Sequence, residues 1–242
     1  MKNAVTTMFM ESSEKVVLFI GGGGKSTLIH LLSKECGNAG QTTAILSASP
    51  SVIPMEANTL VTDSLKNFPD QLEQELRSAQ VIYIGKKLSD EHLEPFAHAE
   101  IMQLIKSDLP VDRVFIEADA VNGRSVSGFT GSTSIYPANR YITVMGADAF
   151  NKEIDDNWLK SRDKFWQKKG ILTPINLAEW IASREIFNKL NKKNIPSTFF
   201  LNKVENIFTQ NLAHSFGKKI KQIGIDRVII GSVFNSQFQI IE

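Results

Sequence analysis

Four consecutive glycines followed by lysine and serine form the segment of this sequence most suited to chemistry. The glycines are Gly21, Gly22, Gly23 and Gly24. Lys25, Ser26 and Thr27 come next and open a stretch whose apolar residues have helical spacing. Glycines let backbone N–H groups converge on an anion, and a helix N-terminus adds free donors and the positive end of its dipole. The segment therefore predicts a loop that binds the phosphates of ATP or GTP, with Lys25 on the outer phosphates and Ser26 on Mg²⁺.

The start of this glycine loop can be placed in two ways. The common pattern G-x-x-x-x-G-K-[ST] puts Phe19 where the first glycine usually stands. The shorter pattern G-x-x-G-K-S begins at Gly21 and is similar to the loop of Mur-type ligases, which make acyl-phosphates from ATP. Lys25 and Ser26 keep their roles in both interpretations.

Two carboxylates follow an apolar run at residues 114–116. Glu117 and Asp119 are two residues apart, so in a strand their side chains point to the same face. Acidic groups at the end of an apolar strand are costly unless they are paired or bind a metal. We expect Asp119 to hold Mg²⁺ together with Ser26, and Glu117 either to share that task or to activate a nucleophile.

An arginine and a further carboxylate are weaker candidates for the same site. Arg124 follows the acids and could neutralise charge on a transferred phosphoryl group, bind another substrate anion, or lie at the surface. Asp148 follows the next apolar run and could face the site or serve as a turn residue. The candidate catalytic residues are Lys25, Glu117, Asp119 and Arg124.

A late apolar run at residues 198–201 is followed by the tetrad N-K-V-E. In many GTPases an N-K-x-D tetrad after a late strand holds guanine, and its carboxylate accepts from the base. Here the fourth residue is Glu205, which is one methylene longer. We expect Asn202, Lys203 and Glu205 to contact the nucleotide, and a preference for guanine is the narrower hypothesis. Alternatively, Asn202 ends a strand and Glu205 lies in the first turn of the following helix.

Short apolar runs alternate with longer amphipathic stretches along the chain. Runs rich in β-branched and aromatic residues predict strands at 16–20, 43–47, 81–84, 114–118, 141–145, 198–201 and 227–231. Apolar residues with helical spacing predict helices at 99–107, 174–181 and 206–223. Thr173 is the expected N-cap of the second helix. The expected apolar face of the third is Phe208, Leu212, Phe216, Ile220 and Ile223.

Strands that alternate with helices imply parallel pairing through right-handed crossovers. The predicted fold is therefore α/β, with a mostly parallel sheet and helices on both faces, like the three-layer sandwich of P-loop nucleoside triphosphatases. No linker or repeat interrupts the chain, so residues 1–242 are predicted to form a single domain. The irregular stretch 146–172 is a candidate lid or small subdomain.

The composition narrows the possible function classes. The 242 residues include 27 Lys+Arg and 26 Asp+Glu, so the net charge of +1 provides no basic surface for nucleic acid. A single cysteine, Cys36, excludes an intramolecular disulfide and a cysteine-based zinc site. No apolar run approaches the roughly 18 residues that a membrane helix needs, and no signal peptide is recognisable. We therefore expect a cytoplasmic protein without a nucleic-acid or membrane partner.

Several segments, taken in order, make this sequence resemble the YqeC family. They are the glycine loop at 21–26, E-A-D at 117–119, G-R at 123–124, G-x-D-A at 146–149, L-T-P at 172–174, L-N-K-x-E at 201–205 and R-V-I-I-G-S at 227–232. The family is described as accessory proteins of selenium-dependent molybdenum hydroxylases and as selenium cofactor biosynthesis proteins. The resemblance implies a nucleotide-binding protein whose partner is a client molybdenum or selenium enzyme.

The sequence departs from the family pattern at Ala120, Ser125 and Ser127, where relatives carry glycine, proline and lysine. These departures affect an expected substrate site more than the nucleotide site. The leading hypothesis is a protein that hydrolyses ATP or GTP, or transfers a phosphoryl group from it, during maturation of such an enzyme or its cofactor. Two alternatives stay open: a small-molecule kinase or ATP-dependent ligase, and a non-catalytic nucleotide sensor or scaffold.

Overall fold

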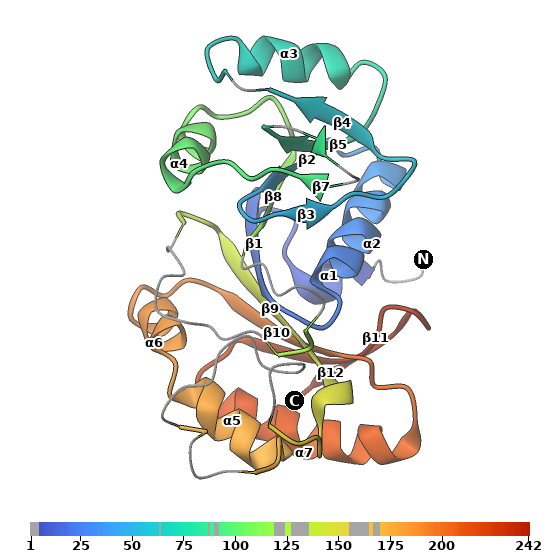
Figure 1. The fold of residues 1–242 in the computed structure, drawn as a ribbon, viewed down its shortest axis with the longest axis vertical. Coiled ribbons are helices and arrows are strands. Elements are labelled where there is room, and N and C mark those ends of the chain that lie inside the picture. Colours follow the sequence, from blue (N-terminus) through green and yellow to red (C-terminus); the bar gives the residue numbers. More distant parts are fainter. Residues whose placement is uncertain are drawn as a thin grey trace. The chain divides into compact units, whose positions relative to one another are not determined.

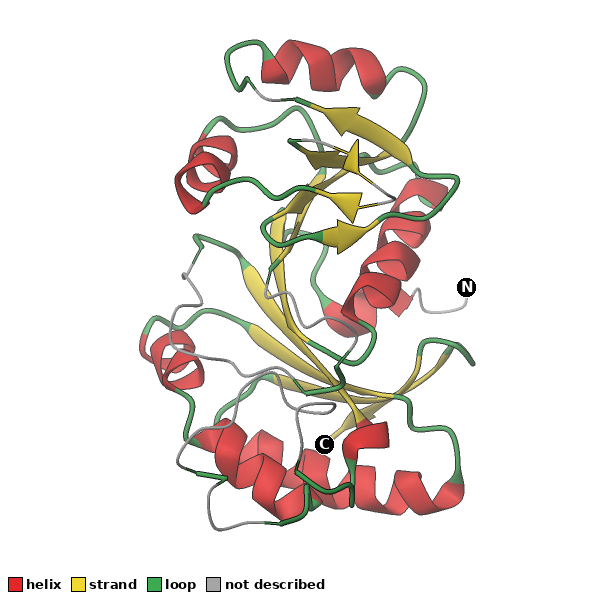
Figure 2. Cartoon of the chain, in the orientation of Figure 1, coloured by secondary structure: helices red, strands yellow, loops and turns green. Residues whose placement is uncertain are grey.

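The computed structural model describes residues 5–62, 64–86, 88–89, 92–118, 124–126, 136–154, 165–166 and 170–242. Contacts between Cα atoms divide the chain into two compact units. The first unit comprises Met1–Phe19, Ser26–Ala120 and Ser134–Asn139, and the second comprises Ile20–Lys25, Val121–Thr133 and Arg140–Glu242. Figure 1 labels most of the helices and strands of both units, and Figure 2 distinguishes helices, strands and loops by colour.

The first unit is built on five parallel strands. Their order is β1 (Val16–Gly21), β8 (Arg113–Glu117), β2 (Thr43–Ser47), β5 (Val81–Gly85) and β4 (Asn58–Val61). Strands β8 and β2 lie between parallel neighbours and are buried along their whole length, which explains the run of three apolar residues at the centre of each. A small second sheet contains β3 (Ser51–Val52), β7 (His92–Leu93) and β6 (Leu88–Ser89).

Three helices connect the parallel strands of this unit. α2 (Lys25–Asn38) leads from β1 to β2, α3 (Phe68–Glu75) from β4 to β5, and α4 (His98–Lys106) from β5 to β8. The first connection moves along the sheet in one direction and the other two move in the opposite direction, so right-handed crossovers place α2 on one face and α3 and α4 on the other. Figure 1 shows α2 and α4 on opposite sides of the strands. A short helix, α1 (Val5–Phe9), precedes β1.

Four strands form the sheet of the second unit. β9 (Arg140–Gly146), β10 (Ser197–Asn202) and β11 (Arg227–Ser232) are parallel neighbours, and β12 (Gln237–Ile241) pairs antiparallel with β11. A single 3₁₀ turn, η1 (Ala147–Ala149), follows β9 directly. Since the three parallel strands run the same way, the residues that follow them gather at one edge of this sheet.

Helices α5, α6 and α7 share one face of this second sheet. α5 (Pro174–Ala182) and α6 (Glu185–Lys192) lie between β9 and β10, and α7 (Ile207–Gln222) lies between β10 and β11. Both connections move along the sheet in the same direction, so right-handed crossovers put these helices on the same side. The Phe216 ring of α7 lies 5.5 Å from that of Phe150 and 5.7 Å from that of Phe199, between ring centroids. These aromatic contacts join helix and sheet in the core of the unit.

The predicted α/β fold is confirmed, because in each unit the strands of the main sheet that the structure describes are parallel neighbours, and β12 is the one described exception. The seven predicted strands and three predicted helices are present, with ends shifted by at most one residue. Thr173 caps α5, since its Oγ1 accepts from the Asn176 N–H at 3.1 Å. The prediction for Phe208 was wrong: this side chain is 65% exposed at the start of α7. The buried face of α7 is Ala213, Phe216, Gly217 and Ile220.

The stretch 146–172 is described only in part. Glu153 forms a β-bridge with Ile171, and residues 155–164 and 167–169 lie outside the described residues. The hypothesis of a lid or subdomain therefore stays a prediction, as does the single domain. In the part of the chain that the structure describes, none of the helices has the length and apolar character required to cross a bilayer.

The amino ends of β2 and β8 are joined by a reciprocal contact that predicts a pH effect. Asp112 accepts from the Thr42 N–H at 2.7 Å and the Thr42 hydroxyl at 2.9 Å, and these hydrogen bonds lower the pKa of the Asp112 carboxyl. A lowered pKa means that the ionised form stabilises the folded state at neutral pH, and that this stabilisation is lost as the pH falls through the folded-state pKa. We expect urea unfolding of Asp112→Asn between about pH 6 and pH 2 to depend less on pH than that of the wild type. Parallel curves for the two proteins would contradict the role of Asp112.

Candidate functional site

The glycine loop turns sharply out of β1. Phe19 is fully buried within this strand, its ring 5.2 Å from that of Phe115, and β1 continues to Gly21, where φ is +97°. Gly23 and Gly24 also have positive φ, at +69° and +110°. Because the turn begins at Gly21, the geometry favours the shorter loop pattern over the one that starts at Phe19.

The loop is packed against the carboxyl end of β9 and against residues 124–126. The Gly22 N–H donates to the Val144 carbonyl at 2.9 Å, and the Gly23 N–H donates to the Arg124 carbonyl at 3.0 Å. A Cβ on Gly21 would lie 2.1 Å from Val144 O, and one on Gly22 would lie 2.3 Å from Arg124 O. The first N–H groups of the loop therefore anchor it to its own unit. The N–H groups of the first turn of α2 point out of the end of the helix, where an anion can accept from them.

The Asn202 side chain forms a further contact that holds the glycine loop in place. This side chain is 5% exposed, its Nδ2 donates to the Gly23 carbonyl at 2.8 Å, and its Oδ1 accepts from the Val233 N–H at 3.0 Å. A Cβ on Gly24 would lie 2.4 Å from Asn202 Nδ2. Both polar ends of this side chain are therefore used inside the protein, where they connect the loop to the ends of β10 and β11.

Lys203 and Asp148 form an ion pair just past the carboxyl ends of β10 and β9. The Lys203 Nζ lies 2.6 Å from Asp148 Oδ2 and donates to the Ser125 hydroxyl at 3.2 Å. Lys203 has φ of +64°, an unusual value for a residue with a side chain. This turn sends Lys203 toward β9 and residue 125. Asp148 lies in the η1 turn, which confirms its interpretation as a turn residue, and its role in a ligand site stays a prediction.

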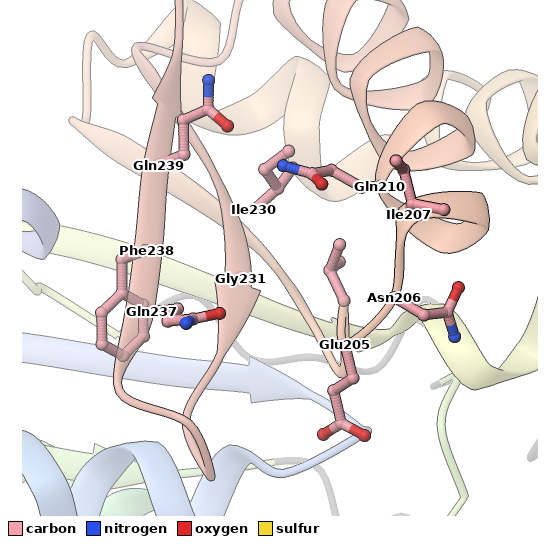
Figure 3. A pocket seen from close by; sticks show the side chains of 10 residues that line it. Glu205, Asn206, Ile207, Gln210, Ile230, Gly231, Gln237, Phe238 and Gln239 are labelled. Atoms are coloured by element: carbon pink, nitrogen blue, oxygen red, sulfur yellow. The ribbon is translucent and has the colours of Figure 1, made fainter.

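Glu205 lies at the rim of a cavity of about 340 Å³ in the second unit (Figure 3). Its Oε1 accepts from the Ser232 hydroxyl at 3.1 Å. The cavity wall carries four amide side chains, those of Asn206, Gln210, Gln237 and Gln239, and the apolar side chains of Val204, Ile207, Ile230 and Phe238. In Figure 3 the Glu205 carboxylate points away from these amides. The alternative interpretation of the tetrad is confirmed for Asn202, which is the last residue of β10. It is wrong for Glu205, which precedes the first turn of α7, because this helix begins at Ile207 with Asn206 as its N-cap.

In the first unit, Ser26 and Glu117 are in direct contact. The Ser26 hydroxyl donates to Glu117 Oε1 at 2.5 Å; Ser26 is exposed, whereas Glu117 is 3% exposed. The Glu117 backbone carbonyl accepts from the Ala48 N–H at 2.9 Å, which ties β8 to the end of β2. A hydroxyl and a carboxylate are the hard oxygen ligands that Mg²⁺ prefers. The pair therefore suits the metal expected from the sequence.

The remaining candidates are placed as follows. Lys25 is 5% exposed at the first position of α2, and Thr27 is exposed two residues later. Arg124 is half-buried, and its backbone carbonyl contacts the glycine loop. Asp119, the first choice for the metal, lies outside the described residues.

Several contacts of these sites could not be found from sequence motifs. Ser47 is buried at the end of β2, and its hydroxyl lies 2.5 Å from the Ser49 carbonyl and 2.6 Å from the Ser51 hydroxyl. Ser125 and Ser232 are also buried, and they contact Lys203 and Glu205 respectively. Serines are common and carry no spacing signal of their own, so only the fold reveals these partners.

A family model described as YqeC protein matches residues 17–162, more than half of the chain. The matched region includes the glycine loop, Ser26, Glu117 and Asp148, and it ends before Asn202 and Lys203. No curated protein matches the chain.

Proposed function

The chain belongs to the YqeC family, and we propose that it binds ATP or GTP with Mg²⁺ and hydrolyses it, or transfers its phosphoryl group, during maturation of a selenium-dependent molybdenum hydroxylase or its cofactor. Family members are described as accessory proteins of such enzymes. The observation that carries the nucleotide part is the glycine loop: three of its four glycines have positive φ, and it leads directly to Lys25 and Ser26 at the start of α2.

Each residue has a defined task in this proposal. Lys25 and the backbone N–H groups of the first turn of α2 bind the phosphates, since a helix N-terminus attracts anions. Ser26 and Asp119 hold Mg²⁺, and Glu117 orients the nucleophile or shares the metal. When bound, Mg²⁺ supplies charge neutralisation at the outer phosphates. Arg124 is the candidate for charge on the transferred phosphoryl group.

The proposal is tested by calorimetric titration with ATP and with GTP, each in the presence of Mg²⁺. We expect at least one of them to bind, and Lys25→Ala to weaken binding by about tenfold or more, because a hydrogen bond to a charged group contributes about 1.5–3 kcal/mol. Lys34→Ala, an exposed lysine on the same helix, is the matched control and should bind as the wild type does. Binding of neither nucleotide by the wild type would refute the nucleotide proposal.

The ligase alternative is favoured by one observation, the start of the loop at Gly21. A ligase of this kind transfers the γ-phosphoryl group of ATP to a carboxylate, which releases ADP and forms an acyl-phosphate. Hydroxylamine traps an acyl-phosphate as a hydroxamate and releases phosphate. Hydroxamate formed with candidate carboxylic acids would favour the ligase, whereas client-stimulated hydrolysis without an acceptor would favour the accessory nucleoside triphosphatase.

A further inference from the structure

The ammonium group of Lys203 lies at the same sheet edge as the glycine loop. Gly146 and Asn202 are register partners at the ends of β9 and β10; Lys203 follows Asn202 directly, and Asp148 lies two residues after Gly146. A Cβ on Gly23 would lie 2.2 Å from the Gly146 nitrogen, so the loop touches the backbone from which Asp148 projects. Ser125 completes this contact, since its carbonyl accepts from the Gly146 N–H at 2.9 Å and its hydroxyl accepts from Lys203.

The contacts of Lys203 leave part of its donor capacity unused. A lysine ammonium has three N–H donors, and in the described part of the chain two are directed at Asp148 and Ser125. The Lys203 side chain is 35% exposed, so its third donor can reach a ligand. Lys203 is not among the residues that line the cavity beside Glu205. Its ammonium group is directed at Asp148 and Ser125 and not at that cavity.

Asp148 is a carboxylate with one of its oxygens unsatisfied. Oδ2 pairs with Lys203, whereas Oδ1 is buried and has no hydrogen-bond partner among the described residues. A buried acceptor without a partner is rare in folded proteins, so this ion pair is not a fully satisfied structural contact. Asp148 orients Lys203 and also places a negative charge beside any anion that Lys203 would bind.

We propose that Lys203 is a second phosphate-binding cation of the glycine-loop site, oriented by Asp148 and Ser125, and that it binds the phosphates and not the base. The inference rests on the proposed nucleotide function and makes it more specific. A lysine beside a glycine loop acts as a point charge on phosphate oxygens. The Asp148 carboxylate lowers the affinity that Lys203 alone would provide, since it repels the same anion.

Inorganic tripolyphosphate separates this role from base recognition because it has no base. We expect Lys203→Met to weaken binding of Mg²⁺-tripolyphosphate and of Mg²⁺-nucleoside triphosphate equally, each by about tenfold. Lys189→Met is the matched control, since Lys189 forms an exposed ion pair with Glu185 at 2.8 Å on α6, and it should leave both affinities unchanged. Loss of nucleotide binding with intact tripolyphosphate binding would assign Lys203 to the base and overturn the inference.

Asp148→Asn provides an independent test if Lys203→Met is too unstable to purify. The amide oxygen of asparagine can still accept from Lys203 and keep it oriented, whereas the negative charge beside the anion is lost, so we expect tripolyphosphate affinity to rise severalfold. Unchanged or lower affinity would overturn the inference. If Lys25→Ala weakens binding and neither change near Lys203 alters it, the proposed function stands without the inference. If the wild type binds neither probe, the proposed function itself fails.

Discussion

Gly23→Ala is expected to destabilise the protein by about 3 kcal/mol and to abolish binding at the glycine loop. Gly23 has φ of +69°, which costs about 1–2 kcal/mol for a residue with a Cβ. The new Cβ would also lie 2.2 Å from the Gly146 nitrogen and 2.6 Å from its Cα. Both neighbours are backbone atoms, so β9 and the loop would have to move apart. Unfolding in urea measures the loss of stability.

Gly40→Ala separates the two causes of this effect. Gly40 also has positive φ, at +79°, but a Cβ there meets no atom within 4 Å. We expect Gly40→Ala to lower the free energy of unfolding only by the cost of positive φ, about 1–2 kcal/mol, and to leave nucleotide binding intact. If Gly23→Ala and Gly40→Ala are equally stable, the close packing of the glycine loop against β9 does not exist in solution.

Asn202→Asp is expected to have the second large effect, again about 3 kcal/mol. Asn202 is almost fully buried, and its Nδ2 donates to the Gly23 carbonyl. An aspartate of the same shape can still accept from the Val233 N–H, but it places a carboxylate oxygen against the Gly23 carbonyl. This repulsion would release the glycine loop from β10. Unfolding in urea and titration with nucleotide measure the two consequences.

Asn191→Asp is the matched control for this change. Asn191 Nδ2 donates to the Ile223 carbonyl at 3.0 Å, next to a glycine of positive φ, but at an exposed position. Water can solvate the new carboxylate there, so we expect a loss of about 1 kcal/mol or less. If Asn202→Asp is as stable as Asn191→Asp, Asn202 is not the anchor of the loop.

The regular elements of the fold were predictable because their signals are local. A fully buried strand such as β8 needs a continuous apolar run, and Thr173 before Pro174 marks a helix start. The short strands β3, β6 and β7 have two residues each, too few to show a period. Phe208 shows that a correct period can also mislead. It has the spacing of the buried face of α7, but it lies at the exposed start of the helix, before the first buried residue of that face, Ala213.

The sequence predicted which residues belong to the candidate site better than it predicted which of them contact one another. The glycine loop and the strand-end carboxylates follow from motif spacing. The structure brings Ser26 into contact with Glu117, whereas Asp119, the expected partner of Ser26 at the metal, lies outside the described residues. The tetrad that begins at Asn202 offered a base-binding interpretation. In the structure Asn202 binds the loop backbone and Lys203 turns toward Asp148. Nucleotide contact by these residues stays a prediction.

Local periodicity and turn chemistry in the sequence were enough to establish the α/β class, the ends of the main elements and the loop of glycines, because each depends on neighbours a few residues away. The pairing of Asn202 with Gly23 and of Lys203 with Asp148 joins residues far apart in the chain. Such pairs depend on which strands become neighbours, here β9 beside β10, and on the backbone angle that aims each side chain. Strand order results from competition among whole-chain arrangements of similar local quality, so only the folded protein reveals it.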